Sequence, residues 1–241
     1  MRSNKELAPA APTPRAKARK NGDQTRRRIL AAAEVLFAQQ GVRATSLRAI
    51  ARAADVHQPS LHYHFRDKAA LFRATLELHV VPLYARRLEA LEAIEAAGRG
   101  DDLDAILRAG QRPILEAWSR PIAPGVTVVS LIYRAIVDAD PEWDAVAEEI
   151  SLPVRERYVA AFQRALPGLS REELLERLNF VQGALAGLYL DRSEDEMNRP
   201  WRGLHADLDA FEDRIVALCK TVLAAPPFGS PAGSRTDRSA S

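Results

Sequence analysis

The chain has 241 residues, of which 47% are hydrophobic and 27% charged, so it can bury a hydrophobic core as one large domain or two small ones. Its single cysteine, Cys219, excludes a disulfide framework and a zinc site built from several cysteines. No stretch approaches the roughly eighteen continuous apolar residues of a membrane span, and the N-terminal residues lack the apolar segment of a secretory signal. We therefore expect a cytoplasmic protein that does not contact a membrane.

The net charge of +2 is the sum of two unlike parts of the chain. Residues 1–73 hold fifteen Lys and Arg against five Asp and Glu, a balance of +10, and the remainder holds 19 against 27, a balance of −8. A solvated basic tail explains part of this excess, but basic residues also lie beyond the tail, among them Arg43, Arg48, Arg52, Arg66 and Lys68. A basic N-terminal part on an acidic body indicates that the N-terminal part binds a polyanion.

Both ends of the chain have the composition of disordered segments. Residues 1–21 are rich in Ala, Pro, Lys and Arg, and residues 226–241 are rich in Gly, Ser and Pro. Between them the apolar residues recur with the helical period and no segment alternates as a strand does, which predicts an all-α protein. We expect about nine helices, near residues 23–40, 47–54, 58–65, 67–97, 102–119, 126–139, 141–166, 170–190 and 204–224.

Capping residues and prolines support several of these boundaries. Asp23 is placed to cap the first helix and Gly41 to end it, while Ser170 and Glu173 form a capping box. Pro82 is expected to kink or end the helix over 67–97. Pro113 and Pro153 are expected to kink two later helices, which then pack imperfectly and leave room for a cavity.

The second and third expected helices are short, are joined by a tight turn at Asp55 and Val56, and follow a longer helix. This arrangement is typical of a helix-turn-helix, whose second helix lies in the major groove of DNA. A plain helical hairpin has the same periodicity, so the polar residues of the third helix are the stronger indication. Its face opposite the apolar side carries groups able to bond base edges, namely Gln58, Ser60, His62 and Tyr63.

Residues 25–72 resemble the DNA-binding domain of the tetracycline-repressor (TetR/AcrR) family of bacterial transcriptional regulators, in the run TRRRILAAAEVLFAQQGVRATSLRAIARAADVHQPSLHYHFRDKAALF. The matching landmarks are the Arg-rich start, Leu36-Phe37 before Gly41, Thr45-Ser46-Leu47, Ile50-Ala51, and Leu61 followed by His64-Phe65 and Lys68. The resemblance implies a homodimeric repressor on a palindromic operator, released when a small-molecule inducer binds the C-terminal domain. It implies no cofactor.

The resemblance also assigns contacts with DNA. It implies base-reading positions at Gln58, Pro59, Ser60 and His62, and phosphate contacts at Thr45 or Ser46, Tyr63 or His64, and Lys68. Arg43, Arg48 and the N-terminal arm add attraction that does not depend on sequence. The chain departs from the family pattern at three positions: Asp55 replaces the turn glycine, His57 replaces the serine N-cap, and His62 replaces a tyrosine, with Tyr63 beside it.

We divide the chain into an arm (1–21), a DNA-binding domain (22–68), a domain for ligand sensing and dimerisation (69–225) and a tail (226–241). The candidate ligand residues are His79, Arg112, Trp118, Tyr133, Arg134, Tyr158, Phe162, Phe180 and Tyr189, although aromatic residues at helical spacing often form plain core. The candidate dimer interface consists of small residues, Gly183, Ala184, Ala186 and Gly187, which serve packing within one chain equally well.

Alternative functions remain open from the residues alone. One alternative is an enzyme that uses the C-terminal pocket. Against it, the sequence shows no recognisable nucleophile–base spacing, metal motif or cofactor loop. His62 and His64 lie roughly 200° apart on one helix, so they do not converge on a metal ion. A DNA-binding regulator or activator without a ligand has the same sequence signature. We expect a protein that is nucleoid-associated when it is bound to double-stranded DNA.

Overall fold

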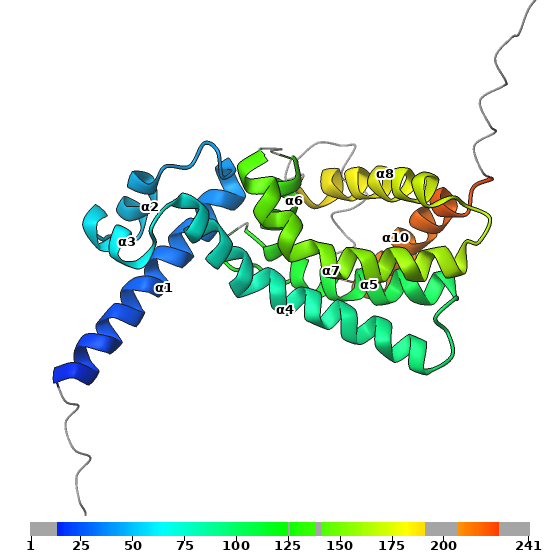
Figure 1. The fold of residues 1–241 in the computed structure, drawn as a ribbon, viewed down its shortest axis with the longest axis horizontal. Coiled ribbons are helices and arrows are strands. Elements are labelled where there is room, and N and C mark those ends of the chain that lie inside the picture. The colour runs from blue at the N-terminus through cyan, green and yellow to red at the C-terminus, as the bar shows by residue number, and fades with distance from the viewer. Residues whose placement is uncertain (1–13, 125, 138–140, 191–206, 227–241) are drawn as a thin grey trace, which may run out of the picture.

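The computed structural model describes residues 14–124, 126–137, 141–190 and 207–226, and this part of the chain forms nine helices (Figure 1). This confirms the expected all-α class for the described residues. The helices are α1 (Pro14–Gln40), α2 (Leu47–Ala53), α3 (Gln58–His64), α4 (Lys68–Ala96), α5 (Leu103–Trp118), α6 (Val128–Val137), α7 (Pro141–Ala165), α8 (Arg171–Leu190) and α10 (Leu208–Leu223).

The first three helices pack into a small bundle, because each has one apolar side that the other two bury. Ile29 and Phe37 of α1, Ile50 of α2 and Leu61 of α3 are completely buried in one hydrophobic cluster. The connection between α1 and α2 needs a left-handed residue, and Gly41, with φ 81°, supplies it as expected. Ser46 then caps α2 by accepting a hydrogen bond from the amide of Ala49.

The first helix is longer than expected. It begins at Pro14, so the prediction that Asp23 caps it is wrong, as is the prediction of disorder for residues 14–21. The physical reason is that this stretch is rich in Ala, Lys and Arg, which favour helix, and that a proline is tolerated in a first turn. The expected disorder of residues 1–13 and 227–241 lies outside the described residues.

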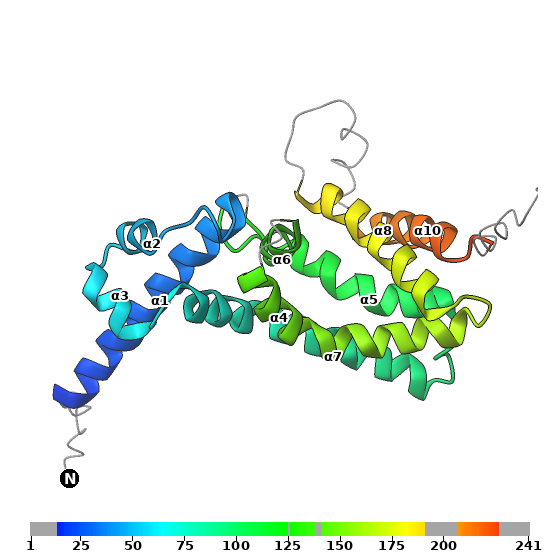
Figure 2. The ribbon, with the colours of Figure 1, turned by 45° about the horizontal axis from the view of Figure 1, so that its top comes forward.

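The remaining helices form a second, larger body. The helix α4 runs out of the first bundle into this body, where α5 and α7 lie along it and α8 and α10 pair on the far side (Figures 1 and 2). Pro82 does not end α4, which continues to Ala96, and Pro113 and Pro153 lie inside α5 and α7. Ser170 accepts a hydrogen bond from the amide of Glu173, as expected for one half of a capping box.

The two bodies share a hydrophobic cluster across the expected boundary after residue 68. Phe37 of α1 packs edge-on against Phe72 of α4, with ring centres 5.6 Å apart. Leu131 of α6 is buried in the same cluster, because α6 lies against α1 (Figure 2). A polar contact joins the bodies as well, between His79 Nε2 of α4 and Glu34 Oε1 of α1, at 2.8 Å. Movement of α4 or α6 is therefore coupled to α1.

Candidate nucleic-acid interface and ligand cavity

Most of the predicted base-reading residues are exposed on the outer face of α3. Gln58, Pro59 and His62 are exposed, and Tyr63 is 86% exposed. At 100° per residue these four side chains fall within about 140° of the helix circumference. Ser60, also a predicted base-reading residue, lies at the edge of this face and is half-buried. The exposed face combines an amide, imidazole and phenol, which donate and accept hydrogen bonds at base edges.

The turn between α2 and α3 explains how aspartate replaces glycine. Asp55 has φ 51°, in the left-handed region that glycine adopts readily and that aspartate tolerates at some cost. Arg28 of α1 donates to the Asp55 carbonyl at 2.5 Å and to its carboxylate at 2.8 Å. These two bonds stabilise the strained turn and fix the angle between α2 and α3. Sequence analysis missed Arg28 because the two residues are 27 positions apart.

The N-terminus of α3 lacks a side-chain cap. His57 has the extended backbone of an N-cap, with φ −71° and ψ 142°, but its side chain forms no cap hydrogen bond. Histidine is not among the residues favoured as N-caps, so this end of α3 lacks the bond that a serine would accept.

Replacing His57 by serine is expected to raise the free energy of unfolding by about 0.5–1 kcal/mol, because the hydroxyl accepts from an amide in the first turn of α3. Urea denaturation at one protein concentration measures the change. His57→Ala provides the control and should leave stability near that of the wild type. Equal stability of the serine and alanine variants would contradict the prediction.

The predicted phosphate-binding residues separate into two groups. Arg43, Ser46 and Arg48 are exposed around the α1–α2 connection and the start of α2, where a phosphate can reach them. Thr45 is 1% exposed and donates its hydroxyl proton to the Gly41 carbonyl at 2.7 Å, so it is not available to DNA. His64 is half-buried, with its ring 5.2 Å from that of Tyr63.

Lys68 has a structural role that the sequence did not indicate. Its ammonium group donates to the carbonyls of Val42 at 2.9 Å, Thr45 at 3.1 Å and Arg43 at 3.4 Å. These bonds hold the connection between α1 and α2 against the start of α4. Its part in phosphate binding stays a prediction, and its replacement is expected to disturb this loop as well.

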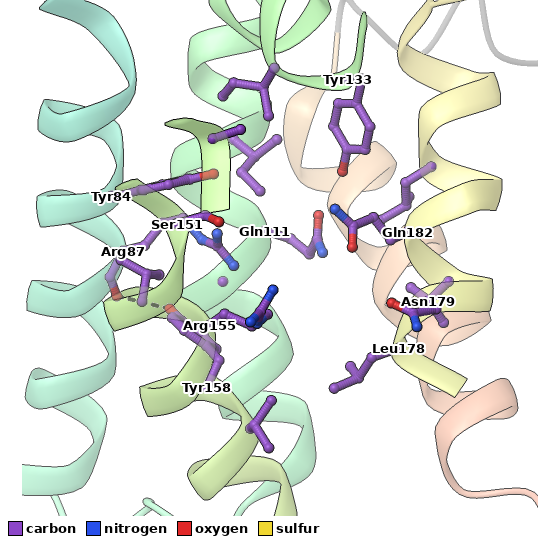
Figure 3. Close-up of a pocket in the computed structure, with 18 of the residues that line it drawn as sticks. Tyr84, Arg87, Gln111, Tyr133, Ser151, Arg155, Tyr158, Leu178, Asn179 and Gln182 are labelled. Carbon is purple, nitrogen blue, oxygen red and sulfur yellow. Dashed lines mark hydrogen bonds between the residues drawn. The ribbon is translucent and has the colours of Figure 1, made fainter. Parts of the chain in front are cut away.

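The larger body contains a cavity of about 490 Å³ between α4, α5, α6, α7 and α8 (Figure 3). Three predicted ligand residues line it, namely Tyr133, Tyr158 and Phe162. Burial raises the pKa of the Tyr158 hydroxyl to about 12, and the nearby charge of Arg87 offsets part of this effect. Burial also raises the pKa of Tyr133, so both phenols stay protonated at neutral pH.

The other predicted ligand residues lie elsewhere. Arg112 pairs with Asp209, Glu116 and Glu212, and His79 contacts Glu34, so both side chains take part in contacts with other helices. Trp118 and Tyr189 pack edge-on in the core, with ring centres 5.4 Å apart, and neither lines the cavity. Arg134 is also absent from the cavity lining, and Phe180 is 68% exposed on the outer side of α8.

Sequence analysis missed several polar side chains of the cavity lining. Among them are Arg87 of α4 and Gln111 of α5 (Figure 3). The sequence could have indicated Arg87, because this residue continues the helical spacing of the buried stripe on α4, which is formed by Leu76, Val80, Leu83 and Leu91. An arginine on the core-facing stripe of a helix indicates either a buried ion pair or a ligand contact.

An apolar groove lies on the outer side of α8 and α10. Phe180, Ala184 and Gly187 line it from α8, and Leu218, 56% exposed, lines it from α10. A Cβ atom added at Gly187 would meet nothing within 4 Å, so this side of α8 is open to a neighbouring helix. Gly183 is equally open, whereas Ala186 is buried within its own chain, and its assignment to the interface is wrong.

Within the described ranges, no helix is both long and apolar enough to cross a lipid bilayer. The same residues contain no group of three or more His, Cys, Asp or Glu side chains placed to hold a metal ion.

Two family models match the chain. Residues 29–75 match the bacterial regulatory proteins of the tetR family, and residues 108–221 match the tetracyclin repressor-like C-terminal domain. The HTH-type transcriptional regulator AcrR of Shigella flexneri is 45% identical over 62 residues, which span 26% of this chain and 29% of that regulator. The first match covers α2 and α3, and the second covers most of α5 to α10.

Solved structures share the fold. A TetR family regulator from Marinobacter aquaeolei VT8 superposes with a TM-score of 0.55 at 19% identity, over 85% of this chain and 97% of that one. The structure of NalD, the secondary repressor of the MexAB-OprM multidrug efflux pump in Pseudomonas aeruginosa, gives a TM-score of 0.51 at 22% identity, over 81% and 96%. The chain therefore belongs to the tetracycline-repressor (TetR/AcrR) family of transcriptional regulators, with a helix-turn-helix DNA-binding domain at its N-terminal side.

Proposed function

We propose that this regulator is a homodimeric repressor that binds a palindromic operator through α3 and leaves it when a small molecule enters the cavity. The observation that carries the proposal is the shared cluster of α1, α4 and α6, because α4 and α6 also line the cavity through Val80 and Tyr133. A ligand that moves either helix therefore acts on α1, against which α2 and α3 pack.

Gln58 and His62 are proposed to read bases. Replacing each by alanine is expected to reduce the preference for operator over unrelated DNA, by about 1–3 kcal/mol for each base-specific hydrogen-bonding side chain removed. Fluorescence anisotropy with both DNAs at one salt concentration measures the preference. Arg48→Ala is the control, since it should weaken binding to both DNAs by a similar factor. The base-reading assignment fails if the alanine variants keep the wild-type preference.

The apolar groove on α8 and α10 is the proposed dimer interface. A single helix-turn-helix reads few bases, and two-fold pairing supplies a second half-site. Ala184→Arg places a charge in the groove and is expected to convert a dimer to a monomer in sedimentation-equilibrium runs. Ala93→Arg on the exposed side of α4 is the matched control and should stay dimeric. A monomeric wild type, or a dimeric Ala184→Arg, would exclude this interface.

Ligand release is tested in two steps. Thermal shifts with hydrophobic acids, acyl thioesters, aromatic compounds and cationic drugs identify compounds that stabilise the protein. Those compounds are then added to the protein–operator complex, and the proposal expects them to lower its affinity. If none stabilises the protein while operator binding is intact, the second candidate is favoured: a DNA-binding regulator or activator without a ligand.

A further inference from the structure

Arg87 is the one cation lining the cavity that lacks an acidic partner among the described residues. Its guanidinium carbon lies 4.8 Å from the ring centre of Tyr158 and 5.7 Å from that of Tyr84. Its Nε is buried and has no hydrogen-bond partner. Arg87 is half-buried, and a partly desolvated cation without a counter-ion is unfavourable, so an anion in the cavity would gain both charge neutralisation and hydrogen bonds here.

The other charged side chains of the cavity are already satisfied or face solvent. Arg155 of α7 donates two hydrogen bonds to the carboxylate of Glu148, at 2.6 and 2.8 Å, so its charge is neutralised. Asp144 is exposed on the same helix. Asn179 and Gln182 of α8 are exposed as well, so the opening of the cavity lies between α7 and α8 (Figure 3). Arg87 faces this opening from the α4 wall.

Gln111 supplies a second polar group to the same cavity. Its Oε1 is buried without a hydrogen-bond partner, and its side chain points from α5 into the cavity (Figure 3). The two ends of an amide exchange by a half-turn, so Gln111 offers either an acceptor or two N–H donors to a ligand. A guanidinium and an amide aimed at one space form a binding site for a carboxylate.

On the α5 side of the cavity, Gly110 leaves room for the Arg87 side chain to lie close to the helix. A Cβ atom added at Gly110 would meet Tyr158 Cε1 at 3.0 Å and Arg87 Nη2 at 3.6 Å. Glycine at this position therefore admits both side chains against the α5 backbone. The Tyr158 hydroxyl donates to the Arg87 carbonyl at 2.8 Å and fixes the ring beneath the guanidinium.

Most of the remaining lining is apolar, which favours a ligand with an apolar body. Its side chains include Leu76, Val80, Ile106, Ile114, Val154 and Phe162. The volume of about 490 Å³ lies within the range of small-molecule sites. A fully polar anion would leave these surfaces without contacts, and a neutral hydrocarbon would leave Arg87 and Gln111 unpaired.

We propose that the cavity binds an amphipathic carboxylate, with its carboxylate between Arg87 and Gln111 and its apolar chain or ring among the tyrosine and aliphatic side chains. The proposal rests on the proposed function in one respect, because it takes this cavity as the sensor site. It adds the chemical class of the ligand and the residues that select it.

Isothermal titration calorimetry on the full chain, without DNA, tests the ligand class. The probes are decanoate against decanol and decyltrimethylammonium, and naphthoate against naphthalenemethanol, all below micelle-forming concentrations. At least one carboxylate is expected to bind wild-type protein about tenfold or more tightly than its matched alcohol, since a hydrogen bond to a charged group contributes on this scale. The cationic probe is expected to bind more weakly than the alcohol.

Variants assign the preference to Arg87. Arg87→Met should bind acid and alcohol equally, whereas Arg87→Lys should keep part of the preference and controls for folding. Arg86→Met removes the same charge from the neighbouring position outside the cavity lining, and should keep the full preference. The proposal is overturned if neither carboxylate binds wild-type protein, if the alcohols or the cation bind as tightly, or if Arg87→Met retains the preference.

The same probes separate this proposal from the proposed function. If a carboxylate binds through Arg87 but leaves the protein on operator DNA, the carboxylate site stands and ligand-released repression fails. If a neutral or cationic compound releases the operator while the carboxylates do not bind, ligand-released repression stands and the carboxylate proposal fails.

Discussion

Phe72→Ala is expected to lower the free energy of unfolding by about 3–5 kcal/mol, the cost of truncating a large aromatic side chain in a packed core. Phe72 is fully buried and packs edge-on against Phe37 in the cluster that joins α1, α4 and α6. Truncation leaves a cavity where the DNA-binding helices meet the larger body. The variant should therefore lose operator binding at a clearly lower temperature than the wild type does.

Leu78→Ala is the control for Phe72→Ala. Leu78 lies on the same helix and is 50% exposed, so its truncation should cost less than about 0.5 kcal/mol. Urea denaturation of the three proteins at one concentration gives the comparison. A destabilisation below about 1 kcal/mol for Phe72→Ala would show that this cluster does not hold the two bodies together.

Arg177→Met is expected to cost about 3–5 kcal/mol, because it removes one partner from a buried network. The arginine is 3% exposed and donates to the carbonyls of Leu223 at 2.8 Å, Ala225 at 2.6 Å and Pro226 at 2.7 Å, at the end of α10 and just after it. It also pairs with Glu173 at 2.6 Å. The variant leaves these carbonyls and a half-buried carboxylate without their donor, and it releases α10 from α8.

Arg171→Met is the control that shows whether the cost of Arg177→Met comes from burial of the arginine or only from loss of its charge. Arg171 also lies on α8 and pairs with a glutamate, Glu156, but both side chains are more than 40% exposed, so the expected cost is below about 1 kcal/mol. Because α8 and α10 form the proposed dimer groove, Arg177→Met should also weaken dimerisation in sedimentation runs. Equal destabilisation by the two variants would contradict the buried-network account.

The local features of the DNA-binding helices could be predicted from the sequence, because they depend on residues close together in the chain. Gly41 has the positive φ expected of a residue that ends a helix, and Ser170 accepts the expected cap bond. The apolar period also identified the buried sides of α1, α2 and α3. Only the start of α1 differs, because the prolines before residue 14 gave the segment a disordered composition although the residues after it favour helix.

The ligand residues could not be predicted as well, because the partners of a side chain are set by packing between distant segments. Arg112 meets Asp209 and Glu212, which are 97 and 100 residues away, and this pairing removes it from ligand binding. Phe180 is aromatic at helical spacing like Tyr158, yet it lies on the outer side of α8. The hydrophobic period shows which face of a helix is apolar. It does not show which face of that helix another helix covers.

The central claim is that α3 reads DNA while the basic N-terminal part neutralises phosphates. The measurement that tests it most directly is the affinity of the full chain for DNA from its own promoter region and for a scrambled duplex, by fluorescence anisotropy at rising salt. We predict tighter binding to the promoter DNA, with affinity falling about a thousandfold or more between roughly 50 and 200 mM salt. Equal affinity for the two DNAs, or affinity independent of salt, would contradict the account.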